Sequence, residues 1–151
     1  MTDLKRIEAQ LGRSPRAFSG VAVRCPHGGP AVTEQQPFDC VGEPFPTQFW
    51  LSCRHLSARI ARIESHGGVE RFSLLARDDP ELSASLARAD AEQRSIRPEL
   101  AAGIGGGRGG GSLKCLHAHA AFALARPGYA LGERILAEAA PLWPDGHCCV
   151  P

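Results

Sequence analysis

The stretch TQFWLSCRHLSARIARIESHGG, residues 47–68, contains a change of hydrophobic period that decides the fold class. In residues 47–53, Phe49 and Leu51 fall on one face, which is the period-two pattern of a strand. After residue 53 the apolar residues recur at helical spacing until Gly67 ends the run. These residues are Leu56, Ile60 and Ile63. The pattern predicts a strand followed at once by an amphipathic helix that begins near Arg54.

The segments on either side of this junction predict further strands and helices. Residues 17–25 and 31–34 have the composition of two strands, separated by a turn, and residues 35–46 form a loop with three prolines. Helices are predicted over residues 1–12, 68–78, 81–94, 112–125 and 130–140. We therefore expect an α+β fold, in which a small antiparallel N-terminal sheet packs against four to five helices. A single domain spans residues 1–151, with a glycine-rich loop at 103–111 and an irregular tail at 141–151.

Composition limits the classes of function. Of the 151 residues, 43% are hydrophobic, which suits one domain with a real core. The net charge of +1 and the aromatic content of 6% argue against a nucleic-acid partner. There is no run of about 20 apolar residues, and the charged N-terminus lacks the apolar segment of a signal peptide, so we expect a cytoplasmic protein that does not insert into membranes. Six cysteines are then expected to be thiols.

The cysteines and histidines form a pattern typical of metal ligation. Three Cys-x-His units begin at Cys25, Cys53 and Cys115, and two more cysteines close the chain. Zinc prefers four Cys or His ligands in a tetrahedron, and cysteine-rich ligation also suits an iron–sulfur cluster. The predicted metal ligands are Cys25, Cys53 and Cys115, with the fourth from His119, His117 or Cys149. The competing interpretation is that these thiols only pack in the core.

The choice of histidine depends on where the helix near Cys115 begins. In a helix over residues 112–125, Cys115 and His119 lie four residues apart and point together. If the helix begins only after Cys115, His117 becomes available as well. A Cys115 thiol beside either histidine would also suit a nucleophile, because a helix N-terminus favours the thiolate.

The glycine-rich loop before Cys115 suggests an anion site. A glycine-rich backbone that leads into a helix offers N–H groups to a phosphate or carboxylate, and basic side chains lie nearby. The candidate anion-binding residues are Gly107, Arg108, Gly110 and Lys114. The loop does not match the phosphate-binding pattern G-x-x-x-x-G-K-[ST], because Leu113 precedes the lysine and a cysteine follows it. The alternative is a flexible linker.

Several motifs together resemble those of a bacterial family catalogued as domain of unknown function 501. These are RCPHGGPAV, PFPTQFWLSCRHL, RIESHGGVERF, GGSLKCLHAHAAFAL and the final CCVP. The resemblance runs from about Gly12 to the C-terminus and implies a small bacterial cytoplasmic protein without an established activity. The long glycine run and the segment GYALGERI, where the family pattern has an Asn-Pro turn, depart from it.

Three classes of function remain open from the sequence. The first is a metal-binding protein, with zinc or an iron–sulfur cluster in a structural or regulatory role. The second is a small thiol- or metal-dependent enzyme, a hydrolase or transferase, that uses the glycine-rich loop. The third is a protein-interaction module without a bound ligand, in which helices over residues 54–76 and 81–96 contact a protein partner.

Overall fold

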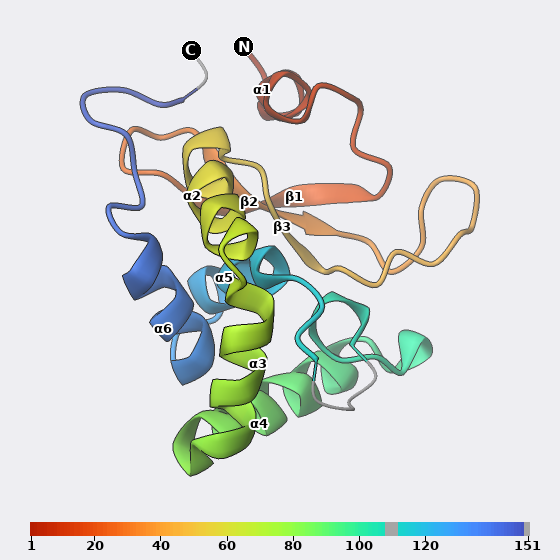
Figure 1. The fold of residues 1–151 in the computed structure, drawn as a ribbon. Coiled ribbons are helices and arrows are strands. Elements are labelled where there is room, and N and C mark those ends of the chain that lie inside the picture. Colours follow the sequence, from red (N-terminus) through yellow and green to blue (C-terminus); the bar gives the residue numbers. More distant parts are fainter. Residues whose placement is uncertain (108–111, 150–151) are drawn as a thin grey trace.

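The computed structural model describes residues 1–107 and 112–149 and has one antiparallel sheet with helices packed around it (Figure 1). Its strands are β1 (Phe18–Arg24), β2 (Pro30–Gln35) and β3 (Phe49–Leu51), in that spatial order. Val32 pairs with Leu51 and both are buried, so the short third strand extends the buried face of the sheet beyond β2. The predicted α+β class with a small antiparallel N-terminal sheet is confirmed.

The helix ends follow from the local sequence. The Asp79 carboxylate accepts hydrogen bonds from the backbone N–H groups of Glu81 and Leu82, at 2.9 and 3.2 Å, and so caps the helix that Pro80 begins. The helices are α1 (Asp3–Leu11), α2 (Arg54–Ser65), α3 (Gly68–Asp78), α4 (Pro80–Ile96), α5 (Leu116–Ala125) and α6 (Ala130–Ala139). Two short 3-10 turns, η1 (Pro98–Leu100) and η2 (Ile104–Gly106), follow α4.

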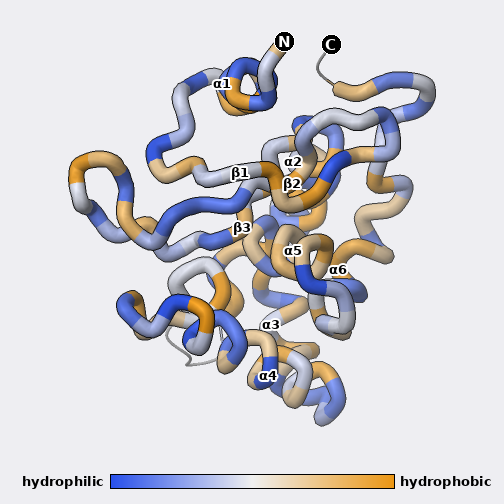
Figure 2. Tube along the Cα trace, turned by 180° about the vertical axis from the view of Figure 1, so that it is seen from behind, coloured by the Kyte–Doolittle hydropathy of each residue, from blue (hydrophilic) through white to orange (hydrophobic). Residues whose placement is uncertain are grey.

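Helix α5 is the centre of the core. Seven of its ten residues are buried, as expected for a helix with apolar residues on every side. It packs against β3, α2 and α6, and the Phe122 ring makes edge contacts with Phe49 and Tyr129 at centroid distances of 5.9 and 5.8 Å. Apolar segments gather there in Figure 2, while α3 and α4 extend away from the sheet in Figure 1. The N-terminus of α5 therefore lies between the sheet and α2.

After α6 the chain runs back past α2 toward the end of the molecule where α1 lies (Figure 1). The ring N–H of His55 donates to the Pro141 carbonyl at 3.2 Å, and that of His27 donates to the Pro144 carbonyl at 2.8 Å. These bonds fix the tail beside the N-terminal half of the chain. Within residues 1–107 and 112–149, no helix combines the length and apolar character that a bilayer span requires.

Candidate functional site

Cys115 immediately precedes α5 and is its N-cap residue. A tight turn sets its position, because its backbone N–H donates to the Leu113 carbonyl at 2.7 Å around Lys114. Lys114 has a φ of 64°, in the left-handed region that residues other than glycine seldom adopt. Left-handed backbone at a residue other than glycine costs energy and tends to occur at functional sites. The strained turn before Cys115 therefore indicates a candidate functional site.

Three potential ligand side chains meet at this point. The Cys115 Sγ lies 3.7 Å from the His117 Nδ1, and the same nitrogen lies 3.2 Å from the Glu64 Oε1. All three ligand atoms fall within 4.8 Å of one another. We call Glu64, Cys115 and His117 the Cys–His–Glu cluster. In the part of the chain that the structure describes, it is the one group of three Cys, His, Asp or Glu side chains gathered so closely.

The hydrogen bond on the far side of the His117 ring determines its tautomer. Its Nε2 lies 3.1 Å from the Ser57 carbonyl, which can only accept, so Nε2 carries the hydrogen. In the neutral ring, Nδ1 therefore presents a lone pair to the Glu64 carboxylate and the Cys115 sulfur. Burial disfavours a charged ring, but the contacts with Cys115, Glu64 and Ser57 outweigh it and raise the pKa of His117. The arrangement attracts a cation at Nδ1, either a proton or a metal ion.

Glu64 has a second partner that holds its carboxylate in place. Its Oε2 accepts a hydrogen bond from the Leu116 backbone N–H at 2.7 Å, at the positive end of α5. Glu64 and Ser57 are seven residues apart on α2 and share one face of that helix. Helix α2 thus supplies both groups that orient His117, while Oε1 faces the cluster. Glu64 is not among the residues that the sequence predicted.

A cavity of about 310 Å³ opens onto the cluster. Cys115 and His117 line one side, and Phe49, Trp50 and Leu51 of β3 line another. Most of the remaining lining is apolar or small, and Thr47, Ser57, Gly105 and Ala118 complete it. A mostly apolar hollow with a few polar groups at one end is typical of small-molecule sites.

The glycine-rich segment forms one wall of this cavity by close approach. A Cβ on Gly105 would lie 2.9 Å from the Ala118 Cβ, and Gly105 has a φ of 64°, so only glycine fits without a shift. The predicted anion site is not supported at Gly107, whose N–H donates to the Ile104 carbonyl at 3.1 Å. The Lys114 ammonium donates to the Gly106 carbonyl at 3.2 Å. Arg108 and Gly110 lie outside the described residues.

His119 is a core residue rather than a member of the cluster. Its Nε2–H donates to the Leu113 carbonyl at 3.2 Å, and its Nδ1 accepts from the Tyr129 hydroxyl at 2.8 Å. Burial lowers its pKa, so the neutral ring is favoured. The prediction of His119 as a ligand assumed a helix already formed at Cys115, whereas α5 begins at Leu116. His119 instead holds the carbonyl around which the Cys115 turn forms.

The structure does not gather the predicted cysteines at a single centre. Cys53 is the N-cap residue of α2, whereas Cys115 lies beside Glu64, which follows Cys53 by eleven residues in the sequence. At 1.5 Å per residue this separation is about 16 Å, too far for one ion. The Cys53 Sγ lies instead 3.7 Å from the Cys149 Sγ. Cys25 lies near Cys148, since both sulfurs approach the same point beside Gly29.

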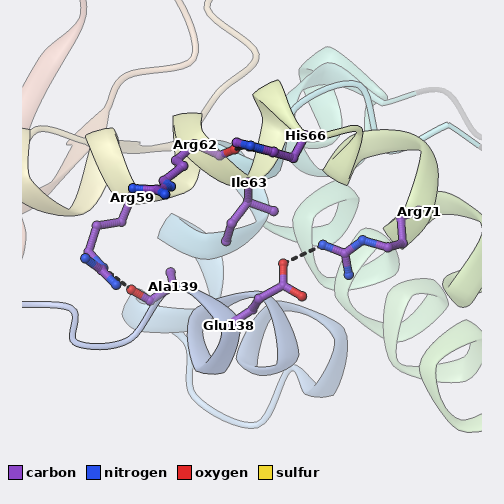
Figure 3. Close-up of a pocket in the computed structure, with 7 residues that line it drawn as sticks. All are labelled: Arg59, Arg62, Ile63, His66, Arg71, Glu138 and Ala139. Carbon is purple, nitrogen blue, oxygen red and sulfur yellow. Dashed lines mark hydrogen bonds and ion pairs between the residues drawn. The ribbon is translucent and has the colours of Figure 1, made fainter.

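Figure 3 shows a second hollow, about 330 Å³ in volume, between α2, α3 and α6. It contains three arginines, but two of them already have protein partners. Arg71 forms an ion pair with Glu138, and Arg59 donates to the Ala139 carbonyl at the end of α6. These bonds join α2 and α3 to α6. We therefore interpret the hollow as a structural contact between the three helices rather than as a binding site.

Comparison with protein families places the chain in one of them. The family model described as Protein of unknown function (DUF501) matches residues 21–103, more than half of the chain. The protein belongs to this family, as its motifs indicated. No curated protein and no solved structure matches it. The matched region contains Glu64 and the β3 wall of the cavity, and Cys115 and His117 follow it.

Proposed function

We propose that the protein binds one zinc ion through Glu64, Cys115 and His117, with a fourth coordination position that faces the cavity. The observation that carries the proposal is the 3.2 Å contact between the His117 Nδ1 and the Glu64 Oε1. Both atoms are acceptors once Nε2 donates to Ser57, so a cation between them is required for a favourable contact. A thiol at 3.7 Å completes the set.

The spacing of the three atoms suits zinc. Bonds of about 2.3 Å to sulfur and 2.0–2.2 Å to nitrogen or oxygen, at tetrahedral angles, place ligand atoms about 3.3–3.6 Å apart. The 3.2 and 3.7 Å separations lie close to this range. The Ser57 carbonyl on Nε2 and the Leu116 N–H on Glu64 provide the outer hydrogen bonds that typically orient metal ligands.

An open fourth position favours a catalytic role over a structural one. Structural zinc sites are usually closed by four protein ligands, whereas catalytic sites have three and leave room for water or substrate. Bound zinc acidifies water and polarises carbonyl or phosphoryl oxygens. The adjacent apolar cavity would receive the non-reacting part of a small molecule. We infer a metal-dependent hydrolase or transferase of a small, partly apolar substrate.

The test is metal content and affinity in protein purified without a histidine tag. We expect about one equivalent of zinc per chain. We also expect no visible absorption, whereas an iron–sulfur cluster would absorb visible light. Glu64→Gln retains an oxygen for the Leu116 N–H but loses the charge, and it should weaken zinc binding at least tenfold, as should Cys115→Ser and His117→Gln. Cys40→Ser, in an exposed loop, is the matched control. Less than about 0.1 equivalent after incubation with zinc would refute the proposal.

A second candidate function follows from the same contact between Cys115 and His117. Without metal, a proton at Nδ1 would pair with a Cys115 thiolate at the start of α5, which is the arrangement of a thiol nucleophile. Such a protein would contain no zinc, and iodoacetamide would alkylate Cys115 faster in the wild type than in His117→Gln. Metal analysis therefore separates the two candidates directly.

A further inference from the structure

A pair of cysteine sulfurs lies at the opposite end of α2, away from the Cys–His–Glu cluster. Here the Cys53 Sγ and the Cys149 Sγ are 3.7 Å apart, although 96 positions separate them in the sequence. Neither Cys53 nor Cys149 forms a disulfide in this structure. A disulfide requires an S–S distance of about 2.05 Å, so the sulfurs need to approach by less than about 2 Å.

The two sulfurs have different surroundings. Cys53 is only 1% exposed, and burial raises the pKa of its thiol to about 11. Burial also acts on Cys149, but the Arg54 backbone N–H, the Cys53 thiol and the His55 backbone N–H together outweigh it and lower the pKa of that thiol. The Gln10 amide adds a donor at 3.9 Å. These surroundings therefore favour the thiolate at Cys149 and the thiol at Cys53.

The tail that carries Cys149 is held against the body of the protein. Besides the bonds from His27 and His55 to the Pro144 and Pro141 carbonyls, the Arg59 guanidinium donates to the Ala140 carbonyl at 2.8 Å. These contacts come from β1–β2 and α2, and they place residue 149 over the start of α2. The sulfur pair is therefore a product of the fold rather than of neighbouring sequence.

We propose that Cys53 and Cys149 form a reversible disulfide, with Cys149 as the sulfur that a peroxide oxidises first. The Cys149 thiolate attacks one oxygen of hydrogen peroxide, the O–O bond breaks, and after one proton is taken up the products are a sulfenic acid and water. The Cys53 thiol then attacks that sulfur, forming the S–S bond and releasing a second water. Two electrons pass from the sulfurs to the peroxide.

This assignment is favoured over a second metal centre. No third Cys, His, Asp or Glu ligand of the described chain lies within 4.8 Å of both sulfurs, and a structural zinc ion normally needs four ligands. A thiolate at a helix N-terminus beside a thiol with a raised pKa is instead the arrangement of redox-active dithiols. The proposal does not depend on zinc binding at the Cys–His–Glu cluster.

The test is the oxidation of the full chain by hydrogen peroxide in the presence of EDTA, followed by mapping under non-reducing conditions. Trypsin leaves three cysteines in the peptide 25–54 and two in the peptide 135–151, so variants are needed to assign the pair. We expect the two peptides to become linked, two of the six thiols to be lost, and dithiothreitol to reverse both changes. The oxidised protein should also melt at a higher temperature, because the bond closes a long loop.

Serine variants identify the pair. The linked peptides should be absent in Cys53→Ser and Cys149→Ser and should persist in the controls, which are Cys25→Ser, Cys40→Ser and Cys148→Ser. If serine is not tolerated at this buried position, Cys53→Ala provides an apolar alternative. A link that persists without Cys149, a link that requires Cys148 and Cys25, or unlinked wild-type peptides would each overturn the proposal.

Discussion

Tyr129→Phe removes one buried oxygen and tests the support of the Cys115 turn. The Tyr129 hydroxyl donates to the His119 Nδ1 at 2.8 Å, and these residues are 4% and 2% exposed. His119 uses its Nε2–H on the Leu113 carbonyl, so Nδ1 needs a donor. Without the hydroxyl, the nitrogen is a buried acceptor without a partner.

The expected cost is set by desolvation rather than by packing. Phenylalanine retains the ring and its edge contact with Phe122 at 5.8 Å, so little apolar contact is lost. A buried polar group left unsatisfied costs about 1–3 kcal/mol, and we expect the free energy of unfolding to fall by that amount. Urea denaturation measures this change, and the slope of the transition should stay the same.

A double-mutant cycle isolates the hydrogen bond. In a His119→Leu background the buried hydroxyl has no acceptor, so Tyr129→Phe should then leave the free energy of unfolding unchanged or raise it. An equal cost in both backgrounds would show that the hydroxyl acts elsewhere. A loss below about 0.3 kcal/mol in the wild-type background would refute the assigned network.

Two further predictions concern pH and packing. The pKa of His117 is raised in the folded state, so the protonated ring stabilises the metal-free protein. This stabilisation should be complete below the ordinary histidine pKa of about 6.5 and should be lost as pH rises through the raised pKa. Urea midpoints measured across this range should show this decline in the wild type but not in His117→Gln, and a profile that the substitution leaves unchanged would contradict it. In α6, a Cβ on Gly132 would lie 2.6 Å from the Ala123 Cβ. Gly132→Ala should therefore lower the free energy of unfolding, because overpacking costs about 1–3 kcal/mol. This cost should exceed the gain in helix propensity, which is about 1 kcal/mol. Gly20→Ala is the control, because a Cβ at that position meets open space. Thermal or urea unfolding measures both variants. If Gly132→Ala were as stable as the wild type, the close packing of α5 on α6 would be refuted.

The fold was predictable where the signal is local. The change of period after residue 53 placed the start of α2 at Arg54, and the structure begins the helix at that residue. The sheet followed from the segments before it. The apolar pattern continues through Leu113 and predicts the start of α5 at about residue 112, which is earlier than the observed start at Leu116. The left-handed backbone at Lys114 ends that continuity, and Glu64 supplies the cap at Leu116 instead.

The site was only partly accessible to sequence reasoning. Cys115 and His117 were among the candidates because their Cys-x-His spacing is visible in the chain, whereas Glu64 is 52 residues away from the N–H that it caps. In the sequence, Glu64 is only a single carboxylate beside the apolar stripe of α2. Many surface helices have such a carboxylate, so it does not indicate a site by itself. The assignment of His119 depended on the helix start, since a shift of a few residues decides which ring turns inward.

The division of the cysteines between the two ends of α2 has a chemical consequence. At one end a sulfur meets an imidazole and a carboxylate, and this set of groups attracts a cation, either a proton or a metal ion. At the other end a sulfur meets a second sulfur and backbone N–H groups, which stabilise negative charge without an added ion. A chelator should therefore act on the first centre and a reductant on the second. Each reagent tests one assignment while leaving the other intact, since no side chain is shared between the two sets.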